Sequence, residues 1–146
     1  MMAGFSNYYA EAVANHFFRG DAESTIQGRP TELFLALHVG DPSVSEVEFE
    51  ELEGGAYARK LISFAEPDTS LSGSVFKTFI SNNANIVFPS LPACVVTHIG
   101  IWTDRDAGRL MFSDNIYVSA ATPTSIILNN GDSLSIPEGY IKIYIE

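Results

Sequence analysis

From residue 32 onward the sequence alternates between short apolar segments and clusters of turn-forming residues. Glycine, proline and asparagine stand between the segments, and each segment is too short for a typical helix. The last segment is also rich in β-branched and aromatic residues, which favour strands. Many short strands with such turns are typical of a β-sandwich or barrel. The predicted strands are Glu32–Val39, Tyr57–Phe64, Ile86–Phe88, Val95–Trp102, Leu110–Ser113, Ile116–Val118, Ser125–Leu128, Ser133–Ile136 and Tyr140–Ile145.

Residues 1–20 carry a different pattern. Apolar residues recur there at spacings of three and four, which lines up one face of a helix. Ser6 is a suitable N-cap and Gly20 a suitable stop. The sequence therefore predicts a mainly β fold, an antiparallel β-sandwich with a short N-terminal α-helix. The predicted helix occupies residues 1–20, and a single β-sandwich domain occupies residues 21–146.

The predicted helix has a strongly aromatic face, which needs a partner. That partner is either the chain's own β domain or another molecule, and the sequence leaves both alternatives open. If the helix meets another molecule, the predicted interface residues are Phe5, Tyr8, Tyr9, Val13 and Phe17.

Two of the predicted strands have the pattern of strands buried on both faces. Glu32–Val39 is almost continuously apolar, as strands covered on both sides are. In Val95–Trp102, Ile99 and Ile101 share one face, whereas His98 and Trp102 share the other. The two faces therefore indicate a strand buried on both sides, or a strand with one side used at a subunit contact.

The composition limits the class of partner. The 146 residues include 18 acidic and 8 basic side chains, which gives a formal net charge of −10. Phosphate contacts need clustered Lys and Arg, and the basic residues here are scattered, so we expect no nucleic-acid partner. No apolar run approaches the roughly 20 residues of a membrane-spanning helix. The N-terminus lacks the pattern of a signal peptide, so we expect no membrane partner and synthesis in a cytosol.

The most acidic stretch runs from Glu46 to Glu53 and ends at Gly54. It could bind a cation or dock on a basic surface, but calcium loops need ligands at defined spacing around a turn-forming glycine, and that spacing is missing here. We therefore favour a solvated loop or a short exposed helix, with the role of the stretch left open.

No pattern of catalytic or ligand-binding residues emerges. Cys94 is the only cysteine and lies in an apolar run, which indicates a small buried side chain. His16, His38 and His98 each stand apart from other potential ligands, which favours structural histidines over a metal site. Asp104–Gly108 lies between two predicted strands and fits a hairpin turn. We predict no enzymatic activity, no catalytic residues, no metal and no cofactor.

Six segments, in order, resemble a family of small proteins of tailed bacteriophages described as tail fibre or minor virion structural proteins. They are Ala3–Glu11, Leu33–Pro42, Gly54–Arg59, Ile80–Pro89, Val96–Ile101 and Asn130–Leu134. The chain departs from the family pattern in its denser acidic stretch and in Arg105, which replaces a small or apolar turn residue.

The resemblance implies a structural component of a tailed-phage virion. The expected role is that of a tail fibre or fibre-attachment protein that self-associates, with a trimer favoured, and docks other virion proteins. It would be located in the virion and assembled in the host cytoplasm. One alternative is a capsid decoration, neck or baseplate protein. Another is a receptor-binding module for a host surface glycan, for which the candidate aromatic residues are Tyr8, Tyr9, Trp102 and Tyr117.

Overall fold

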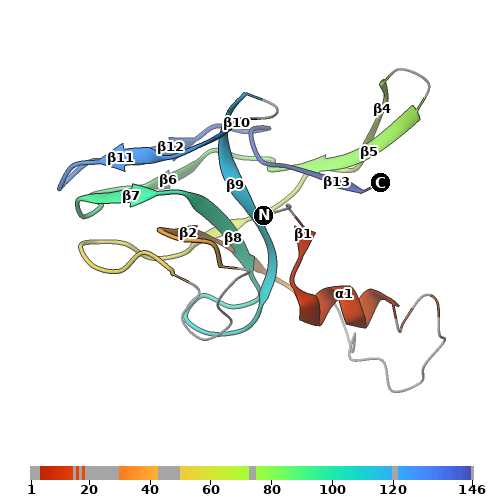
Figure 1. Cartoon of the computed structure of the whole chain (residues 1–146), viewed down its shortest axis with the longest axis horizontal. Coiled ribbons are helices and arrows are strands. Elements are labelled where there is room, and N and C mark those ends of the chain that lie inside the picture. The colour runs from red at the N-terminus through yellow and green to blue at the C-terminus, as the bar shows by residue number, and fades with distance from the viewer. Residues whose placement is uncertain are drawn as a thin grey trace.

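The computed structural model describes residues 4–14, 16, 18, 30–42, 50–72, 75–119 and 122–145. Most of them form short antiparallel strands, and one helix lies near the N-terminus (Figure 1). The predicted fold class, a mainly β chain of antiparallel strands with a short N-terminal helix, is confirmed. The elements are β1 (Gly4–Phe5), α1 (Asn7–Ala14), β2 (Leu33–His38), β3 (Lys60–Ile62), β4 (Asp68–Ser72), β5 (Val75–Ser81), β6 (Ile86–Phe88), β7 (Cys94–Val96), β8 (His98–Trp102), β9 (Leu110–Ser119), β10 (Thr122–Thr124), β11 (Ile126–Leu128), β12 (Leu134–Ile136) and β13 (Lys142–Ile145).

The helix begins directly after Ser6, as predicted. The backbone N–H of Tyr9 donates to Ser6 Oγ at 3.4 Å, and that of Ala10 donates to the Ser6 carbonyl at 2.9 Å. The predicted stop at Gly20 lies outside the described residues. In the described part of the chain, no helix has both the length and the apolar character needed to cross a membrane. The division of the chain at residue 20 into a helix and a single domain stays a prediction.

The first layer of the fold is a sheet with the strand order β1–β9–β8–β2–β3, in which β10 also pairs with β9. β7 leads almost directly into β8. β9 pairs with β8, and β11 pairs with β7. Asn115 of β9 lies opposite His98, and Ile126 of β11 lies opposite Val96. Between these two pairings the chain forms the β9–β10 hairpin. β9 and β11 are therefore two parts of one interrupted strand.

The second layer is a long ribbon in which β5 and β6 pair with β13 and β12, and β4 lies beside β5. Asn82 joins the two halves of the ribbon where its ladder is interrupted. The buried Asn82 amide donates to the carbonyls of Ala84 and Pro137, at 2.9 and 3.0 Å, and accepts from the Ile141 N–H at 2.8 Å. Asn82 thus satisfies backbone groups that the interrupted ladder leaves unpaired.

The main hydrophobic core lies between the two layers, and the sandwich is closed along only one of its long sides. On the closed side the chain after β3 pairs with the end of β5, where Ala65 N–H donates to the Ser81 carbonyl at 2.8 Å. On the other side, no backbone hydrogen bond joins the described residues of β9 and β11 to those of β12 and β13. The core residues are Leu35, Leu37, Leu52, Ile62, Ile86, Phe88, Leu91, Val96, Ile101, Phe112, Leu128, Ile141 and Ile143.

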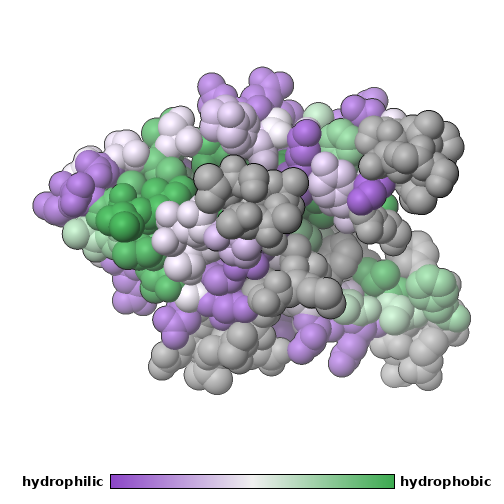
Figure 2. Space-filling view, turned by 45° about the horizontal axis from the view of Figure 1, so that its top comes forward, coloured by the Kyte–Doolittle hydropathy of each residue, from purple (hydrophilic) through white to green (hydrophobic). Residues whose placement is uncertain are grey.

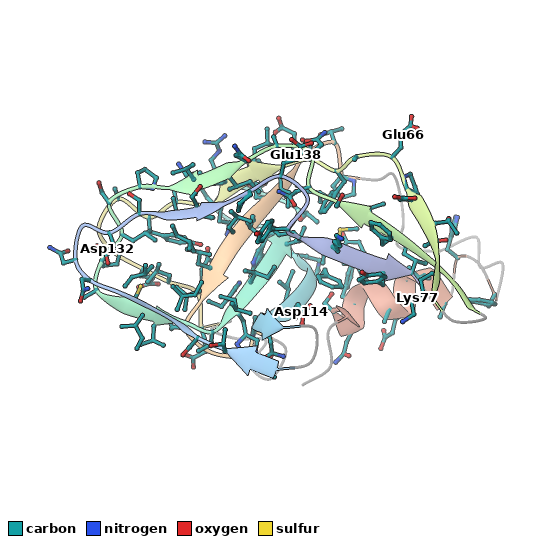
Figure 3. The ribbon with its side chains drawn as sticks, turned by 90° about the horizontal axis from the view of Figure 1, so that it is seen from above. Glu66, Lys77, Asp114, Asp132 and Glu138 are labelled. Atoms are coloured by element: carbon teal, nitrogen blue, oxygen red, sulfur yellow. The ribbon has the colours of Figure 1, made fainter. Side chains whose placement is uncertain are left out.

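Two loops close one end of the sandwich by crossing between the layers. Residues 89–93 link β6 to β7, and residues 129–133 link β11 to β12. The N–H of Leu91 donates to the Asp132 carbonyl at 2.7 Å, and the N–H of Gly131 donates to the Leu91 carbonyl at 2.8 Å. Seen from above, Asp132 marks this end of the molecule (Figure 3). The Leu91 side chain is completely buried in the main core, and its backbone is hydrogen-bonded to the second loop, so both loops are held against the core.

The outer face of the first layer is also covered, so β2 is buried on both faces as predicted. Here the His38 ring stacks on Trp102, with ring centroids 6.2 Å apart. Gly100 makes room for this ring, because a Cβ at that position would lie 2.5 Å from His38 Nε2. Trp102 is only 4% exposed, so the face of β8 that carries it is buried within the domain and is not a free subunit contact.

We predict that Gly100→Ala lowers the free energy of unfolding by about 1–3 kcal/mol, because the added methyl group overpacks the site against His38. Urea unfolding of the purified variant measures the change. The matched background is His38→Ala, in which the ring that the methyl group meets is gone. In the His38→Ala background, Gly100→Ala should lower the free energy of unfolding by less than it does in the wild type. An equal decrease in both backgrounds would contradict the packing explanation.

Candidate assembly interface

Among the described residues, a densely hydrogen-bonded polar cluster is centred on Arg59. Its Nε and Nη2 donate to the two carboxylate oxygens of Glu51, at 2.9 and 2.7 Å, in a bidentate ion pair. The guanidinium also stacks on Trp102, with Cζ 4.0 Å from the ring centroid. Its Nη1 donates to the carbonyls of Asp104 and Ala107, at 2.9 and 2.8 Å. Arg59 therefore fastens the hairpin Asp104–Gly108 over the outer face of the first layer.

Tyr57 completes the cluster. Its hydroxyl donates to Glu51 Oε1 at 2.8 Å and accepts from the backbone N–H of Leu37 in β2 at 3.1 Å. Burial and the negative charge of Glu51 raise the pKa of Tyr57, so the phenol stays protonated at physiological pH. Burial alone would raise the pKa of Glu51, but the hydrogen bonds from Arg59 and Tyr57 and the positive charge of Arg59 outweigh it and lower the pKa.

These bonds explain part of the acidic stretch. Glu51 departs from the predicted solvated loop, because it is half-buried and paired, whereas Glu50 and Glu53 are exposed. The stretch from residue 43 to residue 49 lies outside the described residues. Each polar group of the Arg59 cluster is bonded to another group of the protein, so the cluster is suited to holding the fold together and leaves no free base or nucleophile.

The surroundings of the described histidines and of Cys94 do not form a metal site or activate a nucleophile. His38 and His98 are opposite each other on neighbouring strands, but among the described residues no group of three or more His, Cys, Asp or Glu could hold a metal ion. His98 Nδ1 lies 2.8 Å from Thr97 Oγ1, and burial lowers its pKa. His16 is exposed. Burial raises the pKa of the half-buried Cys94 thiol, the opposite of what a nucleophilic cysteine needs.

The predicted interface residues of the N-terminal helix are only partly covered by their own chain. Of the described helix residues Ala12 alone is buried, and Tyr8 is 36% exposed. The Tyr8 and Tyr9 rings contact each other edge to face, and the Arg109 guanidinium lies 4.1 Å from the Tyr8 centroid. Val13 is half-buried. The side chain of Phe5 and all of Phe17 lie outside what the structure describes, so their part in an interface stays a prediction.

β1 fixes where this helix can lie. Gly4 pairs with Ser113 and Phe5 with Phe112 on the outer edge of β9, and the Ser6 N–H donates to the Met111 carbonyl at 3.0 Å. Because β1 is antiparallel to β9, the chain runs toward the start of β9 as it enters the helix. The helix is therefore anchored near Arg109, at the end of β9 that lies far from Ile116.

A lateral cleft opens along the unclosed side of the sandwich, between β9 and β11 on one wall and β12 and β13 on the other. Its volume is about 650 Å³, and it exposes part of the main core. Figure 3 shows Asp114 on the β9 side and Glu138 at the turn between β12 and β13. Tyr140 and Tyr144 stand at the β13 wall and are 76% and 50% exposed. The aliphatic lining consists of Ile99, Ile116, Ile126, Leu134, Ile136 and Ile141.

Sequence reasoning missed this cleft. The alternation of Leu134 and Ile136 with serines did indicate one apolar face in β12, but a sandwich normally seals such a face inside. That the two edges stay apart depends on the pairing of strands far apart in the sequence. A second apolar area, where Val95 and Ile127 lie opposite each other and are 43% and 75% exposed, covers β7 and β11 (Figure 2).

Comparison with protein families gives a match to the family described as podophage GP4 fiber I protein gp80 (Gp80), over residues 4–144. The chain belongs to this phage fibre family. The resemblance to tail fibre proteins inferred from six short segments is therefore confirmed. Among curated individual proteins, none matches the chain.

The segments that resemble the fibre family meet in two places in the fold. At the closed end of the sandwich, Leu134 of Asn130–Leu134 pairs with Phe88 of Ile80–Pro89. On the outer face of the first layer, Arg59, His38 and Gly100 come from three different segments and meet at Trp102. For this fibre protein, the matching segments thus hold the framework together.

We predict that the Arg59–Glu51 pair makes stability fall in acid. In the folded state the pKa of Glu51 lies below its ordinary value of 4.5, so its contribution is present above pH 4.5 and is lost as the pH falls through the folded value. Thermal unfolding as a function of pH should show a smaller acid loss for Glu51→Gln than for the wild type. Glu53→Gln removes a negative charge from an exposed position nearby and controls for net charge. Parallel wild-type and Glu51→Gln profiles would refute the role of this pair.

Proposed function

We propose that the chain is a structural component of a tailed-phage virion, a tail fibre or fibre-attachment protein that associates with copies of itself and docks other virion proteins. The family match over residues 4–144 carries this proposal, because it covers nearly the whole chain. The virion is the corresponding location, with assembly in the host cytoplasm before release.

The surface of the domain supports an assembly role. The lateral cleft, the Val95–Ile127 pair and the partly covered helix expose apolar side chains in three places. Apolar surface of this kind, grouped and bordered by polar residues, is typical of sites where proteins meet. The fibre family also favours a non-enzymatic role, in line with the internally bonded polar groups of the Arg59 cluster.

A capsid, neck or baseplate position would use the same surfaces on a different partner. A glycan-binding role has less support from the aromatic residues first considered for it. Trp102 is buried under Arg59 and cannot stack on a sugar, and the side chain of Tyr117 is not among those described. The net charge of −10 continues to argue against nucleic acid as a partner.

We predict that the purified chain forms an oligomer, most simply a trimer, because assembly covers apolar surface that a single copy exposes. Light scattering coupled to size-exclusion chromatography should give a multiple of the 15.9 kDa chain mass. A mass of one chain at every concentration, together with failure to bind any component of the phage particle, would contradict the proposed function.

A further inference from the structure

We propose that α1 of one copy docks in the lateral cleft of a second copy. The inference rests on the proposed self-association and names the two surfaces that meet. One surface is the aromatic side of α1, including Tyr8, with Phe18 just beyond the helix 85% exposed. The other is the cleft between β9, β11, β12 and β13, whose walls are mainly aliphatic. An amphipathic helix in an apolar groove is a common mode of recognition between proteins.

The charges around the two surfaces favour a second copy as the occupant. Two chains of net charge −10 repel each other, so they approach most easily where their charges are few or balanced. Among the described residues, the cleft is lined by a single acid, Asp114, and a single base, Lys142. The only charged residue of α1 is Glu11. Lys142 is exposed, with its Nζ 5.1 Å from the Phe79 ring centroid, and is the lining base that could pair with Glu11 of the incoming helix.

The chain path keeps the helix out of its own cleft. β1 pairs with β9 at Phe112 and Ser113 and runs antiparallel to it, so the helix begins beside the start of β9. There the Tyr8 ring lies under the Arg109 guanidinium. The cleft reaches from Phe112 along β9 to Ile116, in the opposite direction. The helix therefore starts at one end of β9, and the cleft extends toward the other end. This arrangement favours a helix from another chain as the occupant of the cleft.

This arrangement limits the symmetry of the assembly. The helix and the cleft are different surfaces, so each copy gives one and receives the other, either reciprocally in a two-fold pair or around a ring of copies. In a ring the contact is heterologous, and the ring closes when the rotation between copies allows it. Neither arrangement brings two equivalent cleft residues together, as a two-fold dimer centred on the cleft would. This difference separates the proposed contact from the simplest alternative.

Disulfide cross-linking tests the contact. In a Cys94→Ser background, Tyr8→Cys and Tyr140→Cys variants carry one thiol each, at the helix and at the rim of the cleft. Co-produced with different tags and oxidised, the two variants should form a mixed dimer on non-reducing gels. Either variant alone should stay uncross-linked. A Tyr140→Cys protein that cross-links to itself, or an oligomer that gives no mixed dimer, would overturn the inference while leaving the proposed self-association intact.

A second pair of variants tests the same surfaces without cysteine chemistry. Tyr140→Glu places a charge at the rim of the cleft and should convert the oligomer to monomer, as measured by light scattering. Leu61→Glu places a charge at an exposed position on β3, outside the cleft lining, and should leave the oligomer intact. Circular dichroism confirms that both variants fold. An oligomer that Tyr140→Glu leaves intact, or that Leu61→Glu dissociates equally, would overturn the inference. A wild-type protein that is itself monomeric would overturn both the inference and the proposed self-association.

Discussion

The structure depends on covering both faces of β2. This strand is apolar on each side, so one sheet packed against one core would leave half of its residues in water. The inner face meets the main core between the layers. The outer face is covered by the His38–Trp102 stack and by Arg59, which pairs with Glu51 and holds the Asp104–Gly108 hairpin in place.

The sandwich built around β2 is asymmetric, and the assembly that we propose would use this asymmetry. The chain after β3 joins the two layers along one side, and two interlocked loops close one end. Along the other side β9 and β13 stay apart, so the core remains open to solvent through the lateral cleft. A protein that works alone gains stability by closing such an opening, whereas one that assembles can use it as a receptor for another copy.

Several features could be predicted from local sequence. The short apolar segments mark most of the strands but miss β4 and β5, Ser6 marks the start of the helix, and the continuous apolar run at Leu33–His38 indicates burial on both faces. These features depend on neighbours along the chain, and for that reason pattern alone identifies them.

The remaining features depend on residues distant in sequence. The Arg59 cluster joins Glu51, Trp102 and the Asp104–Gly108 hairpin, and no local spacing links these segments. Sequence pattern alone therefore predicts a solvent-exposed Glu51, like the other acids of the stretch. The sequence offers Trp102 as an aromatic residue that could stack on a glycan, whereas in the structure it is buried under Arg59. The cleft was hidden for the same reason, because strand patterns do not say which edges of a sandwich stay apart.

We propose that this domain is a fibre component whose open side is covered by assembly. A cryo-electron microscopy reconstruction of the particle of the phage that encodes the chain would reveal this directly. Several copies of the β-sandwich should fit the fibre density, related by rotational symmetry, with density from a neighbouring copy filling each lateral cleft. Purified particles that lack the chain, or that hold it as isolated copies with the cleft open to solvent, would refute the proposal.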